Sequence, residues 1–362
     1  MSEPLKNNLN YDSIHEFALA VRSVYEPFQV DEFLNSTIDK NWDDLELKAR
    51  GRQLTINIGK YLPNDYKVAI EILGKVSNVY EGWGLFSFPD FVEVFGQDEE
   101  KLDISIAALA GFTEKTSSEL AVRPFIIKYE KRMMAQMFEW SKSENEHLRR
   151  LASEGCRPAL PWGIALNNFK KDPSPVLPIL EQLKTDSSLY VRKSVANNIN
   201  DISKTHPNLV VKLAEEWHGK DERTDWIVKH GCRTLLKKGN RDVLAIFGYG
   251  DTDSVEVSGF ALSSNSVSIG DVIAFSFSVY AENSTKIRLE YGVDYVKANG
   301  KRNRKIFQIS ESTLKKNERK AYTKKHSFAD VSVRKHYVGV HSITLIVNGV
   351  ERGTVDFEVT AR

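Results

Sequence analysis

The chain has 362 residues, of which 41% are hydrophobic and 27% charged, a balance that excludes global disorder and suits two or three globular domains. Fifty Lys and Arg oppose 49 Asp and Glu, so the net charge of +1 does not by itself indicate a nucleic-acid partner. Two cysteines exclude a disulfide framework, and the sequence shows neither the ~20-residue apolar stretch of a membrane span nor an apolar signal core at the N-terminus. We therefore expect a cytoplasmic protein.

The first 250 residues are predicted to be helical. Apolar residues recur every three or four positions within each segment, and Pro, Asn and Gly fall between the segments. The clearest helical patterns cover residues 13–25, 44–62, 130–142 and 206–217.

Part of this helical region is repetitive. Three similar segments begin at Leu148, Val191 and Val228, separated by 43 and 37 residues, the length of helical-hairpin repeats of the HEAT type. In each segment a basic residue directly follows the first apolar one: Arg149, Arg192 and Lys229. We therefore predict a HEAT-like α-solenoid over residues 1–250.

From about residue 255 the apolar residues alternate at period two and are rich in Val, Ile, Phe and Tyr. Five segments show this pattern most clearly: 255–263, 271–280, 286–296, 341–350 and 353–360. The Asn348-Gly349 pair, flanked by valines, predicts a two-residue hairpin turn. About seven strands in such a length predict an immunoglobulin-like β-sandwich over residues 251–362.

Charge is distributed unevenly along the chain. Residues 1–140 have a net charge of −8, whereas residues 141–250 have +5 and residues 251–362 have +4. Within the predicted β domain, thirteen Lys and Arg lie between 297 and 335 against three acids. A charge cluster is often only a solvated surface, but two basic regions in succession favour a polyanionic partner.

Motifs for phosphate loops, zinc hydrolysis and serine hydrolysis are missing, and the eight histidines are scattered. We expect no metal and no cofactor. The candidate chemistry lies instead in carboxylates and one tryptophan. Glu154 has Arg150 four residues before it and Arg157 three after it, so the three share one helix face. Trp162 follows on a corner bounded by prolines. An ion pair beside a packing tryptophan would also explain this pattern.

Two further acids are candidates. Glu119 and Thr116 match a capping box, with Arg123 as an i+4 partner, and capping alone would explain Glu119. Asp201 is predicted near a helix C-terminus, where the helix dipole disfavours a carboxylate, so it needs a compensating partner or a function. Asp186 is predicted to be an ordinary N-terminal helix cap.

The run HLRRLASEGCRPALPWG at 147–163, the repeat at 186–201 and FSFPDFVEVFG at 86–96 resemble the AlkC branch of the AlkC/AlkD bacterial DNA glycosylases. The resemblance implies HEAT-like repeats that bind double-stranded DNA, an Ig-like C-terminal domain, and a cytoplasmic, nucleoid-associated protein. It also implies excision of cationic N-alkylated bases, chiefly N3-methyladenine with N3-methylcytosine and N1-methyladenine, without extrusion into a tight pocket. By motif position, the family's active-site residues correspond to Glu154, Trp162, Asp201 and Glu119.

We therefore hypothesise a monomeric, monofunctional DNA glycosylase, because no lysine stands out as a nucleophile for strand cleavage. The helical region is predicted to contact DNA through Arg149, Arg150, Arg157, Arg192, Lys193, Lys229 and Arg233. The β domain is predicted to close over the duplex as a clamp, using Lys301, Arg302 and Arg304.

Two other classes of function stay open. The first is a non-enzymatic HEAT-repeat adaptor that binds an acidic protein through the same basic surfaces. The second, less favoured, is a carbohydrate-binding or adhesive protein, which the lack of an export signal argues against.

Overall fold

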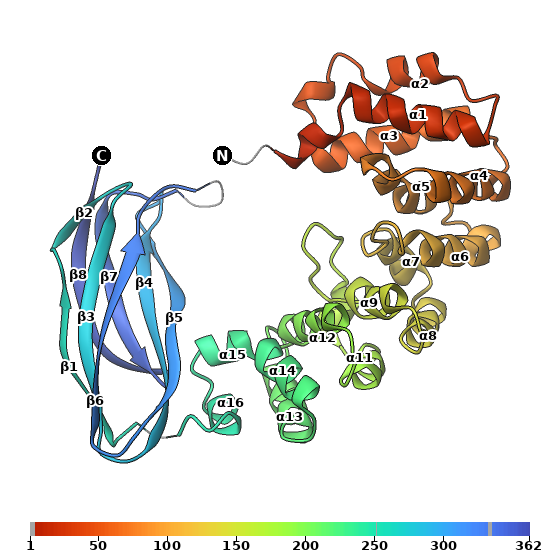
Figure 1. The fold of residues 1–362 in the computed structure, drawn as a ribbon. Helices are drawn as coiled ribbons and strands as arrows, with labels where there is room; N and C mark the ends of the chain where they lie inside the picture. The colour runs from red at the N-terminus through yellow and green to blue at the C-terminus, as the bar shows by residue number, and fades with distance from the viewer. Residues whose placement is uncertain (1–3, 251, 332–334) are drawn as a thin grey trace. The chain divides into compact units, whose positions relative to one another are not determined.

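The computed structural model describes residues 4–250, 252–331 and 335–362, and these form two compact units (Figure 1). The helical unit contains the chain up to residue 205 together with residues 220–231. The sandwich unit contains residues 206–219 and the chain from residue 232 onward. The boundary predicted at residue 250 remains a prediction, and residue 251 itself lies outside the described residues.

The helical unit is a stack of short helices that follow one another in chain order (Figure 1). Its α-helices are α1 (Tyr11–Val24), α2 (Val30–Thr37), α3 (Leu47–Tyr61), α4 (Tyr66–Val79), α5 (Ser87–Phe95), α6 (Leu102–Phe112), α7 (Val122–Lys128), α8 (Glu130–Trp140), α9 (Glu146–Gly155), α10 (Asn167–Lys171), α11 (Leu177–Leu183), α12 (Leu189–Ile202) and α14 (Glu222–Gly231). Within the described residues, this unit also has 3₁₀ turns: η1 (Leu5–Asn8) before α1, and η2 (Trp42–Asp44), η3 (Trp83–Phe86) and η4 (Glu99–Lys101) between later helices. The predicted solenoid is confirmed.

The three repeated segments form α9, α12 and α14, and α12 packs against both of the others. The stripe of Val191, Val195 and Ile199 on α12 is fully buried, because neighbouring repeats cover it. Arg149 donates through Nη1 to the carbonyls five and six residues before it, and Arg192 does the same in the next repeat. The repeated basic residue therefore closes the loop that precedes its own helix.

Asp186 is not the N-cap of α12, which is Ser188. Its Oδ1 accepts the Ser188 amide at 2.8 Å, while its Oδ2 accepts Arg149 Nε at 2.6 Å. Asp186 thus ties the first repeat to the second instead of capping a helix, because its carboxylate satisfies the guanidinium of the neighbouring repeat.

The sandwich unit combines three helices with eight strands. The helices are α13 (Pro207–Trp217), α15 (Arg233–Lys237) and α16 (Arg241–Ile246). The strands are β1 (Val255–Leu262), β2 (Ser266–Ser268), β3 (Val272–Ala281), β4 (Thr285–Val296), β5 (Arg302–Leu314), β6 (Glu318–Ser327), β7 (Gly339–Val347) and β8 (Val350–Thr360). They form a three-stranded sheet in the order β1-β3-β6 and a five-stranded sheet in the order β2-β8-β7-β4-β5. The predicted β-sandwich is confirmed.

The predicted hairpin is also confirmed. Asn348 and Gly349 have φ of 47° and 78°, and Val347 pairs with Val350 across the turn. A side chain on Gly349 would collide with Gly239 in the α15–α16 loop, since an added Cβ would lie 2.7 Å from the Gly239 Cα. The turn therefore needs glycine for its conformation and for its packing.

Most of the basic cluster between 297 and 335, for which the sequence favours a polyanionic partner, lies on β5 and β6. Each of these strands is at the edge of its sheet. Charged side chains on edge strands prevent pairing with other chains, and they obscure the period-two pattern in the sequence. Arg334, one member of the cluster, lies outside the described residues. In the described parts of the chain, no helix is long and apolar enough to cross a membrane.

Candidate active site

The three candidate acids lie in one chain of ion pairs in the helical unit. In order, the ion pairs link Glu119, Arg150, Glu154, Arg157 and Asp201. Arg150 Nη1 pairs closely with Glu119 Oε2, and its Nη2 lies 3.7 Å from Glu154 Oε1. Arg157 Nη1 donates to the same Glu154 oxygen at 2.6 Å, and its Nε donates to Asp201 Oδ2 at 2.8 Å. Residues from three segments of the chain are thereby brought together.

The predicted pairing is confirmed, since both Arg150 and Arg157 reach Glu154, but only Arg150 shares its helix, because α9 ends at Gly155 and Arg157 lies in the loop that follows. Asp201, in the last turn of α12, has the compensating partners that its position requires. Arg157 lies on one side, and Lys204 Nζ donates to its Oδ1 at 2.8 Å on the other. Two cations offset the unfavourable end of the helix dipole.

The capping box predicted at Glu119 is wrong. Helix α7 begins at Val122, so Thr116 lies well outside it, and Pro124 suits the first turn because that turn has no acceptor for a peptide N–H. Arg123 bonds backbone carbonyls instead of Glu119. Glu119 instead pairs with Arg150, and its Oε2 also accepts the Ser117 hydroxyl at 2.8 Å.

The carboxylates of Glu154 and Asp201 differ in how many of their oxygens accept hydrogen bonds. Glu154 is 6% exposed and Asp201 4% exposed, so both lie at the bottom of the site. Both oxygens of Asp201 accept hydrogen bonds. On Glu154, Oε1 accepts the hydrogen bond from Arg157, and within the described residues no hydrogen bond reaches Oε2. Burial alone would lower the pKa of Arg157, but the charges of Glu154 and Asp201 outweigh burial and raise it. Arg157 is therefore a fixed cation that orients two carboxylates.

Tyr190 also belongs to this site, although no sequence pattern pointed to it. It lies at the start of α12, where the Arg150 guanidinium sits over its ring at 5.1 Å from the centroid. Burial raises the pKa of Tyr190, and the charge of Arg150 acts in the opposite direction. The aromatic ring and two acids together fix the position of Arg150.

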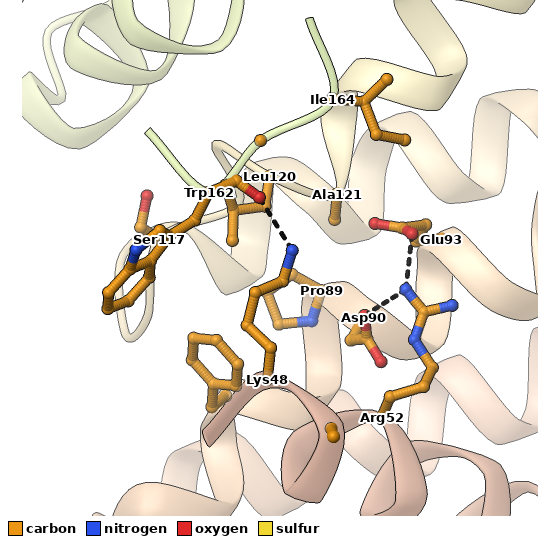
Figure 2. A pocket seen from close by; sticks show the side chains of 13 residues that line it. Lys48, Arg52, Pro89, Asp90, Glu93, Ser117, Leu120, Ala121, Trp162 and Ile164 are labelled. Atoms are coloured by element: carbon orange, nitrogen blue, oxygen red, sulfur yellow. Dashed lines mark hydrogen bonds and ion pairs between the residues drawn. The ribbon is translucent and has the colours of Figure 1, made fainter. Parts of the chain in front are cut away.

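Trp162 projects into solvent from the loop of residues 156–166, which we call the Trp162 loop. Its side chain is 66% exposed and its φ is +64°. Figure 2 shows the loop above a cavity of about 280 Å³, where Lys48 Nζ donates to the Trp162 carbonyl at 2.8 Å. The alternative of a tryptophan that merely packs beside an ion pair requires a covered indole, whereas in the structure the indole is largely uncovered.

Helices α3 and α5 line the cavity below the Trp162 loop. There Arg52 from α3 pairs with Asp90 at 2.8 Å and with Glu93 at 2.6 Å, both on α5 (Figure 2). Burial raises the pKa of Glu93, with the Arg52 bond and charge opposing it. Both acids occur in the FSFPDFVEVFG segment, which was a signal for this region, although no role was predicted for either.

Several predicted DNA-contact residues have intramolecular partners. Arg149 and Arg192 close their own repeat loops, and Arg157 is only 7% exposed between two acids. Arg304 lies between Asp294, at 2.7 Å, and Glu351, and Arg302 donates to Ser342 at 2.8 Å. These bonds give each arginine a structural role, so DNA contact by them remains a prediction.

The remaining predicted contacts differ in their surroundings. Lys193 and Lys301 are exposed, and within the described residues their ammonium groups have no hydrogen bond or ion pair. Lys229 and Arg233 interact with other residues of the chain. Over the described ranges, no group of three or more His, Cys, Asp or Glu could hold a metal ion.

Comparison with known proteins places the chain in a family. A family model described as DNA alkylation repair enzyme matches residues 116–235, and one for the C-terminal Ig-like domain of YhaZ matches residues 256–361. The uncharacterised protein YhaZ of Bacillus subtilis is 46% identical over 355 residues, which are 98% of this chain and 99% of YhaZ. A solved structure, Pseudomonas fluorescens alkylpurine DNA glycosylase AlkC bound to DNA containing an abasic site analog, is 34% identical with a TM-score of 0.95. That match covers 99% of this chain and 100% of the other. The chain therefore belongs to the AlkC-type family of DNA alkylation repair enzymes that carry a C-terminal Ig-like domain.

Proposed function

We propose that the protein is a DNA glycosylase that releases cationic N-alkylated bases from double-stranded DNA. The substrates are chiefly N3-methyladenine, with N3-methylcytosine and N1-methyladenine. The similarity to an alkylpurine DNA glycosylase over nearly the whole chain supports the class of reaction. The arrangement of acids around Arg157 supports the choice of substrate.

The chemistry of the substrate defines what the site must supply. Each of these N-methylated bases is a cation while it is bonded to the sugar, and it becomes neutral when the C1′–N bond breaks and the bonding electron pair moves to the base. The deoxyribose is left with oxocarbenium character, and water then bonds to C1′ and loses a proton. A base that leaves neutral needs no general acid, so the site has to stabilise a cation and orient water.

The observation that carries the proposal is Glu154 Oε2, which accepts no hydrogen bond from the residues that the structure describes. Arg157 holds the other oxygen, so the carboxylate is oriented while Oε2 stays available for the sugar. A carboxylate about 4 Å from the developing charge contributes roughly 1 kcal/mol in water and about 4 kcal/mol at an effective dielectric of 20. This corresponds to about fivefold to nearly a thousandfold in rate.

The other predicted residues take different roles. Asp201 has both oxygens bonded, so it positions Glu154 through Arg157. The Glu119 side chain is 22% exposed and only its Oε2 accepts hydrogen bonds in the described residues, which suits it to orient the attacking water. The exposed indole of Trp162 stacks against the cationic nucleotide and binds it more tightly than a neutral one.

The partner is double-stranded DNA bound by a monomer. Lys193 on the helical unit and Lys301 on the sandwich unit contribute phosphate contacts, and the sandwich unit acts as a clamp. The reaction is hydrolytic and leaves the DNA strand intact.

The test is incubation with duplex DNA treated with a methylating agent, followed by identification of the released bases. We expect release of the three methylated bases without strand cleavage, and a large loss with Glu154→Gln. Glu146→Gln is the matched control, because Glu146 is an exposed acid on the same helix. No release by the wild-type protein, with no preference for alkylated duplexes, would instead favour the HEAT-repeat adaptor.

A further inference from the structure

The Trp162 loop needs restraints that the indole cannot provide. Trp162 has a left-handed backbone conformation, which is unfavourable for a residue with a Cβ. Its side chain is mostly in solvent, so little packing energy offsets that strain. The conformation must therefore be held by contacts to the backbone of the loop.

Arg123 on α7 provides the innermost of these contacts. Its Nε donates to the Ile164 carbonyl at 2.5 Å, two residues beyond Trp162. The loop backbone lies directly on this side chain, because a Cβ added to Gly163 would be 3.0 Å from Arg123 Cδ. The glycine next to Trp162 thus permits the close approach.

The same guanidinium also holds the end of helix α9. Arg123 Nη1 donates to the Gly155 carbonyl at 2.9 Å, and Gly155 directly follows Glu154. One rigid, planar group therefore bonds the helix end that carries the acid and the loop that carries the aromatic ring.

A contribution to fold stability does not explain why a buried arginine occupies position 123. Arg123 is fully buried, and among the described residues it has no carboxylate partner, while its Nη2 has no hydrogen bond. Burial lowers the pKa of Arg123 to about 10. Burying a charge without a carboxylate partner is unfavourable, and two hydrogen bonds to carbonyls compensate it only in part. A residue that costs stability and links two parts of a site is typical of a positioning role.

Lys48 restrains the outer side of the same loop. It lies on α3, more than a hundred residues before Trp162, and bonds the Trp162 carbonyl itself (Figure 2). This contact connects the acidic N-terminal helices, which the sequence left without a role, to the aromatic residue of the candidate site.

We propose that Arg123 is a positioning residue that fixes the Trp162 loop to the Glu154 end of α9, with Lys48 as the outer anchor of the loop. The inference rests on the proposed glycosylase function. It predicts that the two residues act on the reaction only through the position of Trp162 relative to Glu154, without contacting DNA.

The test uses the full chain and Arg123→Met, which keeps the length of the side chain and removes both hydrogen bonds. We expect kcat for release of methylated bases to fall on the order of 10- to 100-fold, with KM changed by less than about threefold. The midpoint of thermal unfolding should fall only slightly, because the two lost hydrogen bonds are partly offset by removal of a buried charge. Arg123→Lys should restore part of the activity, because an ammonium reaches one of the two carbonyls. A kcat equal to that of the wild type in folded Arg123→Met would overturn the proposal.

Lys48→Ala tests the same loop from the other side, and serves even where Arg123→Met does not fold. We expect a smaller loss of kcat, about threefold to tenfold. Lys60→Ala is the control, because Lys60 is an exposed lysine of the same helix whose ammonium bonds Asn57. In a Trp162→Ala background, Arg123→Met and Lys48→Ala should each add less than about twofold. Full multiplicative losses in that background would show that they act independently of Trp162, and would reject the proposal.

A spectroscopic measurement separates this inference from the proposed function. The chain has six tryptophans, so the difference between the protein and its Trp162→Phe variant isolates the emission of Trp162. In Arg123→Met and Lys48→Ala, this emission should show lower anisotropy, whereas in Lys60→Ala it should not change. If the wild type releases no base, the proposed function fails, and the anisotropy still decides whether these residues restrain the loop.

Discussion

Each unit contains a network of buried ion pairs, and the two differ in where their members come from. In the sandwich unit, Arg288 and Glu290 lie two residues apart on β4, and Glu311 is opposite Arg288 in the register of β5. In the helical unit, Glu119, Glu154 and Asp201 come from separate segments. Regular sheet geometry is enough to bring the first network together, because alternate residues of a strand share one face.

The surroundings of the two networks differ as well. Both have buried central members and a partly exposed acid at one end, since the side chain of Glu311 is 19% exposed and that of Glu119 is 22% exposed. The helical network, however, adjoins the Trp162 loop, which is tied through Arg123 to the residue after Glu154. A buried ion pair therefore does not identify a site by itself. Convergence of separate segments beside an exposed aromatic residue is the more informative feature.

The largest expected effects are those of two Glu→Gln substitutions, one of which should lower the rate of base release and the other the stability of the fold. Glu154→Gln should lower the rate of base release by up to about 1,000-fold in single-turnover assays, with little change in DNA binding. Glu290→Gln should cost about 3 kcal/mol of unfolding free energy, because it leaves a buried guanidinium without a full partner, and should leave the rate of the folded protein unchanged. If both variants lost only stability, the contrast between the networks would disappear.

A smaller catalytic effect is expected from Asp201→Asn. Both oxygens of Asp201 are bonded, so the substitution should disturb the orientation of Arg157 and, through it, of Glu154. We expect the rate of base release to fall about 100-fold, less than in Glu154→Gln. A loss larger than that of Glu154→Gln would show that Asp201 is itself the acid nearest the sugar.

Acid should destabilise the sandwich unit through His341. Burial lowers the pKa of this fully buried histidine from 6.5 to about 4, and the charges of Arg302 and His336 act in the same direction while Asp294 opposes them. The folded state therefore disfavours the proton, so the stabilisation is complete above pH 6.5 and is lost as the pH falls through about 4.

At pH 5 we expect the strands to have lost on the order of 2 kcal/mol of protection relative to pH 7. Hydrogen exchange of the strand amides, corrected for the intrinsic effect of pH, measures this loss. His341→Gln keeps an acceptor for the Val296 amide and should show a smaller dependence on pH. An equal dependence would assign the effect to another group.

The smallest effects are expected at the exposed lysines. Lys193→Ala and Lys301→Ala should each reduce the slope of log affinity against log salt by about 1, without loss of stability. Arg149→Ala should mainly reduce stability, because Arg149 bonds Asp186 and two loop carbonyls. Fluorescence anisotropy of labelled duplex DNA over a salt series measures the slopes. A loss of slope in Arg149→Ala comparable to that of Lys193→Ala would restore Arg149 as a phosphate contact.

The sequence by itself determined the helical repeats, the β-sandwich and the Asn348-Gly349 turn. These depend on local periodicity and on the backbone conformations that particular residues allow. It also determined the pairing of Glu154 with Arg150, which is four residues away on the same helix face, and with Arg157, which is only three residues further along the chain.

Only the tertiary structure decided the partners that lie far apart in the chain. Arg157 with Asp201, Arg150 with Glu119, and Arg123 with the Trp162 loop depend on how successive helices stack. The role of each basic residue was decided in the same way. In a sequence, an arginine that bonds a loop carbonyl cannot be told from a lysine whose ammonium is exposed to a phosphate. The two differ only in the groups that the fold brings within hydrogen-bond distance of each.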